Sequence, residues 1–190
     1  MTQNEIKSLI YKLSGLGVIS DKRNIKQINA GPFQSKYAVN NFELSSDDVI
    51  SLVKENPELD KYELLRLVLS DVIEKNRTDH FALMGIYYVL AWAAFENENP
   101  DHFLLTQKGI NANLMMQYNP TLAEQNKDFV KTFVRVIPDN NSSCDKCKKL
   151  AGINYDVNDF LDDLPIPVKG CTKENGICIA LGHIMTEMRY

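Results

Sequence analysis

The chain has 190 residues, 44% hydrophobic and 24% charged, with a formal net charge of −4; this fits one globular domain, or a domain with a small appended module. Residues 1–40 carry six Lys or Arg against two Asp or Glu, whereas residues 41–128 carry seven against fifteen. This acidic middle argues against a broad nucleic-acid-binding surface, which needs a concentrated basic patch.

Helical patterns dominate residues 1–127, which we expect to form a helical domain. The fourth predicted helix, about 79–96, is apolar nearly all round, so it should be the central element on which its neighbours pack. Residues 18–44 are expected to be irregular, with one short strand at most. The predicted starts of the other helices are Thr2-x-x-Glu5, Ser45-x-x-Asp48, Asp60, Pro100 in a first turn, and Thr121-x-x-Glu124.

The pattern changes near Phe129, and residues 128–190 are expected to form a small α+β module. Every second residue from Val130 to Val136 is a β-branched Val or Thr, which is strand periodicity. The other predicted elements are a strand at Ile153–Tyr155, a helix at Val157–Leu164 and a closing strand at Cys178–Met185. The fold class is therefore mainly α, with a helical domain followed by a small α+β, cysteine-containing and zinc-ribbon-like module. This module has few large hydrophobic residues, so its stability needs a cross-link, such as a bound metal or disulfides, or packing against the helical domain.

The N-terminus and the most apolar run determine the expected location. Met1 to Glu5 is polar and resembles a helix start, so we expect no signal peptide. The most apolar run, Phe81 to Phe95, is shorter than the roughly 20 residues that a membrane span needs. We therefore expect a cytoplasmic protein that does not associate with a membrane, in which thiols stay reduced.

All four cysteines lie in the C-terminal module, as the pairs Cys144/Cys147 and Cys171/Cys178. A C-x2-C turn directs two sulfurs at one centre, and a second pair from distant chain completes a tetrahedral zinc site. Because Cys171-x6-Cys178 is wider than the usual spacing, His183 is kept as a substitute for one sulfur. Four protein ligands leave no open position for a catalytic water, so the predicted zinc is structural.

Three other states of the cysteines stay open. They are reduced cysteines without a ligand, a disulfide framework, and a redox-active C-x-x-C pair of Cys144 and Cys147. The redox motif should open a helix directly after a strand in a βαβ unit, whereas the elements that precede Cys144 are helical except for one strand.

The cysteine module resembles a known tail. The residues that carry the resemblance are Val134-Arg-Val-Ile-Pro, Cys144-Asp-Lys-Cys147-Lys-Lys-Leu-Ala-Gly152-Ile-Asn-Tyr155, Leu164-Pro-Ile-Pro-Val-Lys-Gly-Cys171-Thr and Gly176-Ile-Cys178. This pattern is similar to the C-terminal cysteine module of phage head-morphogenesis (minor head) proteins and related bacterial proteins. It covers about a quarter of the chain and departs from the family at its end, where Cys178-Ile-Ala180 replaces Cys-Arg-Cys. The resemblance implies a stabilising or docking unit without a defined activity.

No catalytic residue is predicted. The histidines His80, His102 and His183 are dispersed, and the chain contains no H-E-x-x-H, phosphate-binding glycine loop or Gly-x-Ser-x-Gly. The adjacent pairs Asp47-Asp48 and Asp162-Asp163 are interpreted as exposed charges at helix ends.

Three functions remain from these observations. The first is a non-enzymatic interaction or accessory protein of phage or mobile-element origin, whose zinc-stabilised module helps to bind a macromolecular partner, expected to be a protein. The second is a nucleic-acid-binding regulator that uses the basic residues Lys22, Arg23 and Lys26. The third is a thiol oxidoreductase that acts through Cys144 and Cys147.

Overall fold

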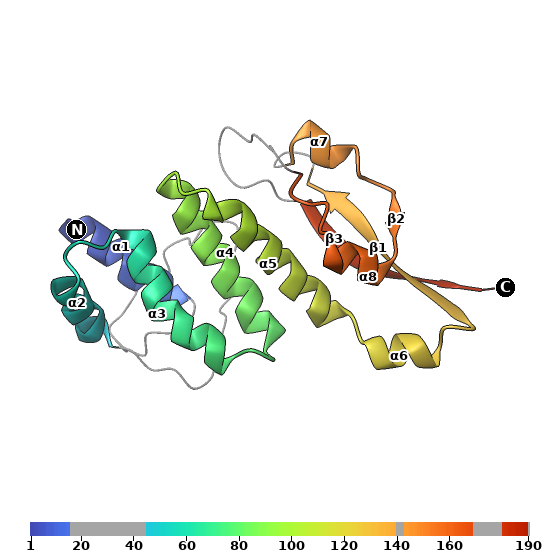
Figure 1. Ribbon diagram of the computed structural model, residues 1–190, viewed down its shortest axis with the longest axis horizontal. Coiled ribbons are helices and arrows are strands. Elements are labelled where there is room, and N and C mark those ends of the chain that lie inside the picture. Colours follow the sequence, from blue (N-terminus) through green and yellow to red (C-terminus); the bar gives the residue numbers. More distant parts are fainter. Residues whose placement is uncertain (16–44, 140–142, 169–179, 190) are drawn as a thin grey trace.

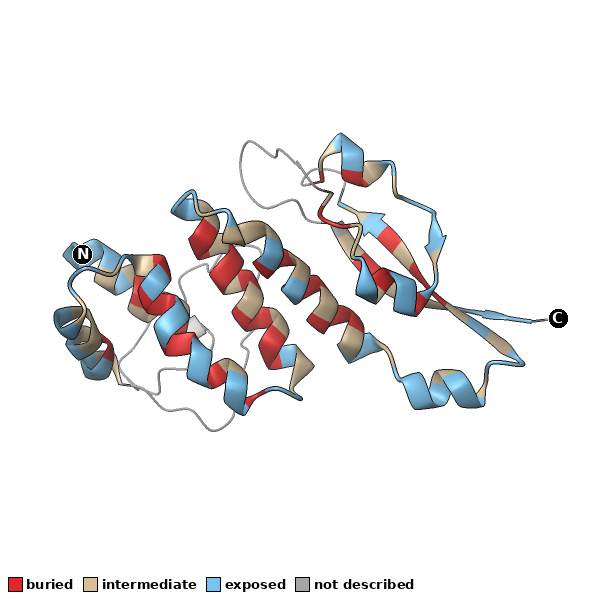
Figure 2. Cartoon of the chain, in the orientation of Figure 1, coloured by how far each residue is buried: buried red, intermediate tan, exposed pale blue. Residues whose placement is uncertain are grey.

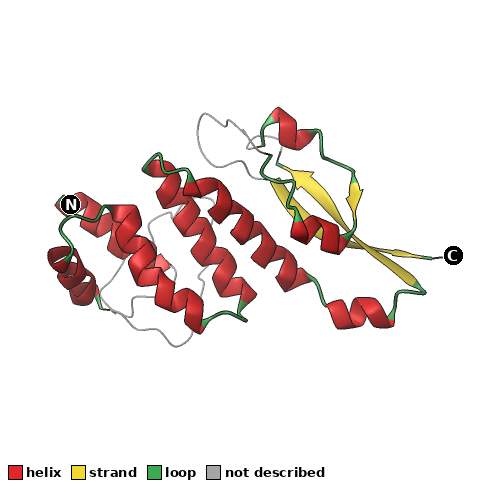
Figure 3. Ribbon diagram, viewed as in Figure 1, coloured by secondary structure: helices red, strands yellow, loops and turns green. Residues whose placement is uncertain are grey.

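The computed structural model describes residues 1–15, 45–139, 143–168 and 180–189. Within these ranges the chain is mainly helical, and a three-stranded antiparallel sheet follows the long helices (Figure 1, Figure 3). The expected irregular stretch 18–44 lies outside the described residues. The described helices are α1 (Gln3–Gly15), α2 (Ser46–Glu55), α3 (Lys61–Lys75), α4 (His80–Glu96), α5 (Asp101–Gln117), α6 (Pro120–Gln125), α7 (Asp145–Lys148) and α8 (Val157–Asp162).

Local capping fixes the starts of the first three helices, as the sequence predicts. The backbone N–H of Glu5 donates to Thr2 Oγ1 (3.3 Å), and the Glu5 carboxylate accepts the Thr2 N–H (2.6 Å). Ser45 forms the same reciprocal pair with Asp48 at the start of α2, and Asp60 forms it with Glu63 at the start of α3. Two backbone donors at each helix end are thereby satisfied.

The predicted cap of the sixth helix is wrong. Helix α6 begins at Pro120, and its N-cap is Asn119, whose side chain accepts the Leu122 N–H (3.0 Å). Asn is a strong N-cap and Pro suits the first helical position, so this pair outcompetes Thr121-x-x-Glu124. Pro100 is the N-cap of α5 rather than a residue of its first turn.

The sheet has the strand order β2-β1-β3 and consists of β1 (Val130–Pro138), β2 (Asn154–Tyr155) and β3 (Ala180–Met188). Strand β3 pairs antiparallel with β1 over its whole length, from Val130 opposite Met188 to Pro138 opposite Ala180. It runs three residues past the predicted end at Met185, whereas α8 ends before Leu164.

Two cores lie on opposite sides of the α4–α5 pair (Figure 2). The first joins α1, α2, α3 and α4 with Leu105 of α5, and Leu13, Leu65 and Ile86 are fully buried in it. The second joins Tyr88 of α4 and Leu114 of α5 to residues of β1, α7 and α8. No helix in the described part of the chain is both long and apolar enough to cross a membrane. Helix α4 is thus the central element that its all-round apolar sequence predicts, with neighbours that cover both of its sides.

Helices α4 and α5 approach closely at Gly109. A Cβ atom at this position would lie 2.9 Å from Cδ1 and Cε1 of the Tyr88 ring. That ring is 5% exposed and belongs to the second core, so it has little room to move. The absence of a side chain at Gly109 therefore sets the separation between the two helices.

Gly109→Ala tests this close approach. A glycine-to-alanine change inside a helix normally stabilises it by up to about 1 kcal/mol, but overpacking costs about 1–3 kcal/mol. We expect a net loss of about 1–2 kcal/mol in the free energy of unfolding, measured by urea denaturation. In a Tyr88→Leu background the same change should be neutral or stabilising. An equal loss in both backgrounds would contradict the assignment to the ring.

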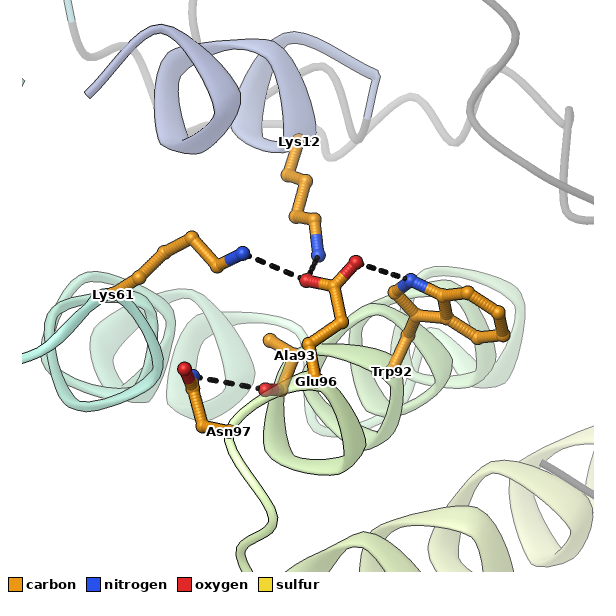
Figure 4. A network of polar contacts seen from close by, with 6 residues as sticks. All are labelled: Lys12, Lys61, Trp92, Ala93, Glu96 and Asn97. Carbon is orange, nitrogen blue, oxygen red and sulfur yellow. Dashed lines mark hydrogen bonds and ion pairs between the residues drawn. The ribbon is translucent and has the colours of Figure 1, made fainter. Parts of the chain in front are cut away.

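One carboxylate ties three helices of the first core together (Figure 4). Glu96 Oε2, at the end of α4, accepts Lys12 Nζ of α1 (2.8 Å) and Lys61 Nζ of α3 (2.7 Å), while Oε1 accepts the Trp92 indole N–H (2.7 Å). The Lys12 and Lys61 side chains are 15% and 16% exposed and Glu96 is 35% exposed. Burial alone would raise the pKa of Glu96, but the hydrogen bonds and charges of the two lysines lower it from 4.5 to about 2.

Glu96→Gln should therefore destabilise the protein in a pH-dependent way. Because the folded-state pKa is depressed, the stabilisation is present above pH 4.5 and is lost as the pH falls towards 2. The shift corresponds to about 3 kcal/mol, and solvent screening of this partly exposed group reduces it to about 1–2 kcal/mol. Denaturation of both proteins between pH 7 and pH 2 should show this difference at neutral pH and its disappearance in acid. The exposed Glu55→Gln change is the control, and a pH-independent difference for Glu96→Gln would refute the linkage.

Candidate metal centre

The C-x2-C motif lies on a single helical turn that follows β1. Cys144 is the N-cap of α7, and its Sγ accepts the backbone N–H of Cys147 at 3.4 Å. Residues three apart on a helical turn face the same side. The turn therefore brings the Cys144 sulfur to the start of the helix that carries Cys147. That the two sulfurs form half of a tetrahedral site stays a prediction.

The second sulfur of the motif is buried. Cys147 has no exposed surface and lies in the second core, where Val136 of β1 is also buried. Its Sγ accepts the backbone N–H of Val168 at 3.4 Å, so the segment after α8 passes directly over this sulfur. The side chain of Gln107 on α5 holds the same segment by donating to the Leu164 carbonyl (3.3 Å). These contacts fix the Cys147 sulfur between α7 and the segment that ends at Val168.

The described residues nearest in sequence to Cys171 and Cys178 are Val168 and Ala180. Cys171 follows Val168 by three residues, and Cys178 precedes Ala180 by two. Covalent geometry limits these Cα separations to about 11 Å and about 7 Å. Ala180 pairs with Pro138 at the end of β1 from which the chain continues to α7. Cys171 and Cys178 themselves lie outside the described residues.

The alternative ligand His183 lies on β3 directly opposite Arg135. Its two neighbours face the second core, because Ile184 packs against that core and a Cβ on Gly182 would meet Leu114 and Phe160. Successive residues of a strand point to opposite faces, so His183 faces away from the core that contains the Cys147 sulfur. This placement favours the four cysteines over a set that includes His183.

Among the described residues, no three His, Cys, Asp or Glu side chains gather to hold a metal ion. The described part of the proposed ligand set is the pair Cys144 and Cys147, and the zinc site stays a prediction that depends on Cys171 and Cys178. The donor set fits zinc chemically, because cysteine sulfurs that also accept hydrogen bonds from the surrounding protein are typical ligands of structural zinc.

The other candidate residues do not converge. Lys22, Arg23 and Lys26 lie outside the described residues. His80 is the first residue of α4, and His102 Nδ1 lies 2.9 Å from the Asn99 carbonyl oxygen at the start of α5. Both histidines are thus at helix starts, as expected for polar residues at helix ends.

A partly exposed group of polar contacts beside the first core has no signal in the sequence. The Tyr62 hydroxyl donates to Asp101 Oδ2 (2.8 Å), which also accepts Arg66 Nη1 at 3.4 Å. Burial, followed by the hydrogen bond to Asp101, raises the pKa of Tyr62 to about 12. A tyrosine with this pKa stays protonated at neutral pH, so the group joins α3 to α5 and is poorly suited to act as a base.

The redox interpretation of the C-x2-C motif lacks its structural context in the described residues. Strand β1 pairs antiparallel with both β2 and β3, and its parallel contact with Ala151, shortly after α7, is an isolated bridge at Val136 rather than a strand pair. A thioredoxin-like motif is expected in a βαβ unit with parallel strands. The surroundings of α7 therefore suit a metal knuckle better than a dithiol active site.

Comparison of the chain with protein-family models, with curated proteins and with solved structures finds no match.

Proposed function

We propose that this chain is a non-enzymatic interaction or accessory protein whose C-terminal module is stabilised by zinc bound to Cys144, Cys147, Cys171 and Cys178. The observation that carries the proposal is the position of the Cys147 sulfur. It is fully buried, accepts the Val168 N–H and lies beside the segment that reaches Cys171 three residues later.

The proposed zinc makes a stable unit from a segment that is poor in hydrophobic residues. Helix α7 has four residues and α8 has six, lengths at which a helix does not persist in water without tertiary support. A metal bound by four sulfurs closes the chain between the two cysteine pairs and adds folding free energy directly. The zinc-ribbon-like character of the module is part of this proposal.

The described residues support the proposed interaction role. The histidines are dispersed, the C-x2-C pair is partly buried, and the perturbed groups Glu96 and Tyr62 are used in ties between helices. The resemblance of the module to the tail of phage head-morphogenesis proteins supports an accessory role in a phage or mobile element, with a protein as the partner and the cytoplasm as the location. A closed zinc site without a water position suits such a structural role.

Elemental analysis of the purified chain beside a Cys144→Ala variant tests the zinc site. We expect about one zinc per chain in the wild type, because four sulfurs complete one tetrahedral site. The variant removes a half-buried sulfur and should lose most of the zinc and melt at a lower temperature. A chelator should lower the melting temperature of the wild type and have little effect on the variant.

Val157→Ala is the matched control, because Val157 lies in the same core but is no ligand. It should lower the melting temperature while zinc stays at about one per chain. Wild-type protein without zinc, whether its cysteines are found as two disulfides by mass spectrometry or as reduced thiols, would overturn the proposal.

A further inference from the structure

Among the strands of the described residues β3 lies at an edge of the sheet, and its hydrogen bonds show which of its amides face outwards. The Ile184 N–H donates to Gln117 Oε1 of α5 (3.2 Å), so it points away from β1. The Arg189 N–H donates to the Phe129 carbonyl (2.8 Å), so it points towards β1. Because amide direction alternates along a strand, Thr186 and Met188 direct their N–H and C=O groups to the open edge.

The open part of this edge begins at Thr186. Before it, Gln117 of α5 covers the edge at Ile184. After it, Thr186, Glu187, Met188 and Arg189 are exposed, and Met188 is 57% exposed. Unpaired strand edges are templates for pairing with another strand, and this one has neither proline nor bulge to prevent it.

We propose that the C-terminal end of β3 pairs antiparallel with the same strand of a second copy of this chain, about a twofold axis at Met188. In this register Met188 exchanges two backbone hydrogen bonds with Met188 of the other copy. Glu187 lies opposite Arg189 of the other copy, and Arg189 opposite its Glu187. The strand end is therefore complementary to itself in charge.

Other registers are less favourable. An axis at Glu187 would place the two Glu187 carboxylates directly opposite one another, and like charges opposite each other destabilise a sheet. An axis at Thr186 would need the Ile184 N–H as a donor to the second copy, but this N–H already donates to the Gln117 side chain. The charges of Glu187 and Arg189, together with the Gln117 side chain that already accepts the Ile184 N–H, therefore favour a twofold axis at Met188.

Helix α6 and the C-terminal end of β3 lie at the same end of the molecule (Figure 1), and exposed apolar residues there would supply further contact area. Phe129, whose carbonyl accepts the Arg189 N–H, is 66% exposed, and Leu122 on α6 is 56% exposed. Helix α6 has no buried residue in the single chain. A six-residue helix gains little stability by itself, so a second copy against this end would give it a packing surface.

Sedimentation of the full chain across a range of concentrations tests the pairing. We expect a monomer–dimer equilibrium for the wild type. Glu187→Arg and Arg189→Glu should each weaken self-association by at least about tenfold, because each places like charges opposite one another. An equimolar mixture of the two variants should form heterodimers, and the Glu187→Arg/Arg189→Glu double variant should form homodimers again, since both restore opposite charges.

Met188→Pro distinguishes edge pairing from a contact elsewhere. It removes an N–H that points away from β1 and leaves the bonds to β1 intact, so it should abolish dimers while the melting temperature changes little. A wild type that stays monomeric at about 100 μM, a concentration that corresponds to a binding free energy of only about −5.5 kcal/mol, would overturn the proposal. Dimers whose stability is unchanged by these substitutions would also overturn it. Zinc measured in the same samples reports separately on the proposed metal site, whose described residues Cys144 and Cys147 follow the other end of β1.

Discussion

The constraint on which the whole structure depends is the apolar character of α4. Its buried residues occur all along the helix and on more than one side, from Ala82 through Tyr88 to Ala94. Such a helix has no face to present to water, so it must be covered on both sides. Helices α1 to α3 cover one side. Helix α5, with the sheet and α8 behind it, covers the other.

This arrangement makes the helical part the platform for the C-terminal module. Helix α5 contacts β3 through the Gln117 side chain and contacts the segment before Val168 through Gln107. Leu114 packs beside Gly182 in the second core. The module, which is poor in large hydrophobic residues, therefore packs against the hydrophobic surface of α5. The position of the cysteine turn depends on this helix, which also packs against α4.

Local signals in the sequence were sufficient for most of the helices and for the main strand. The caps at Thr2, Ser45 and Asp60 act within four residues, and the alternation in β1 is equally local. The outward face of His183 was beyond prediction, because it depends on the register between β3 and β1. The burial of Cys147 depends on Val168, 21 residues away, and the ion pairs of Glu96 span up to 84 residues. Long-range placement of this kind leaves no periodic trace in the sequence.

The register of β3 is itself fixed by packing, and this has a consequence for the cysteines. A Cβ at residue 182 would lie 3.1 Å from Leu114 and 3.2 Å from Phe160. Shifting the strand by one residue would direct either Leu181 or His183 into this space, where even a methyl group is tight. Gly182 therefore fixes the register of β3 in which Ala180 lies opposite Pro138. Because Cys178 is two residues from Ala180, the same register limits how far the Cα atom of Cys178 can lie from the end of β1.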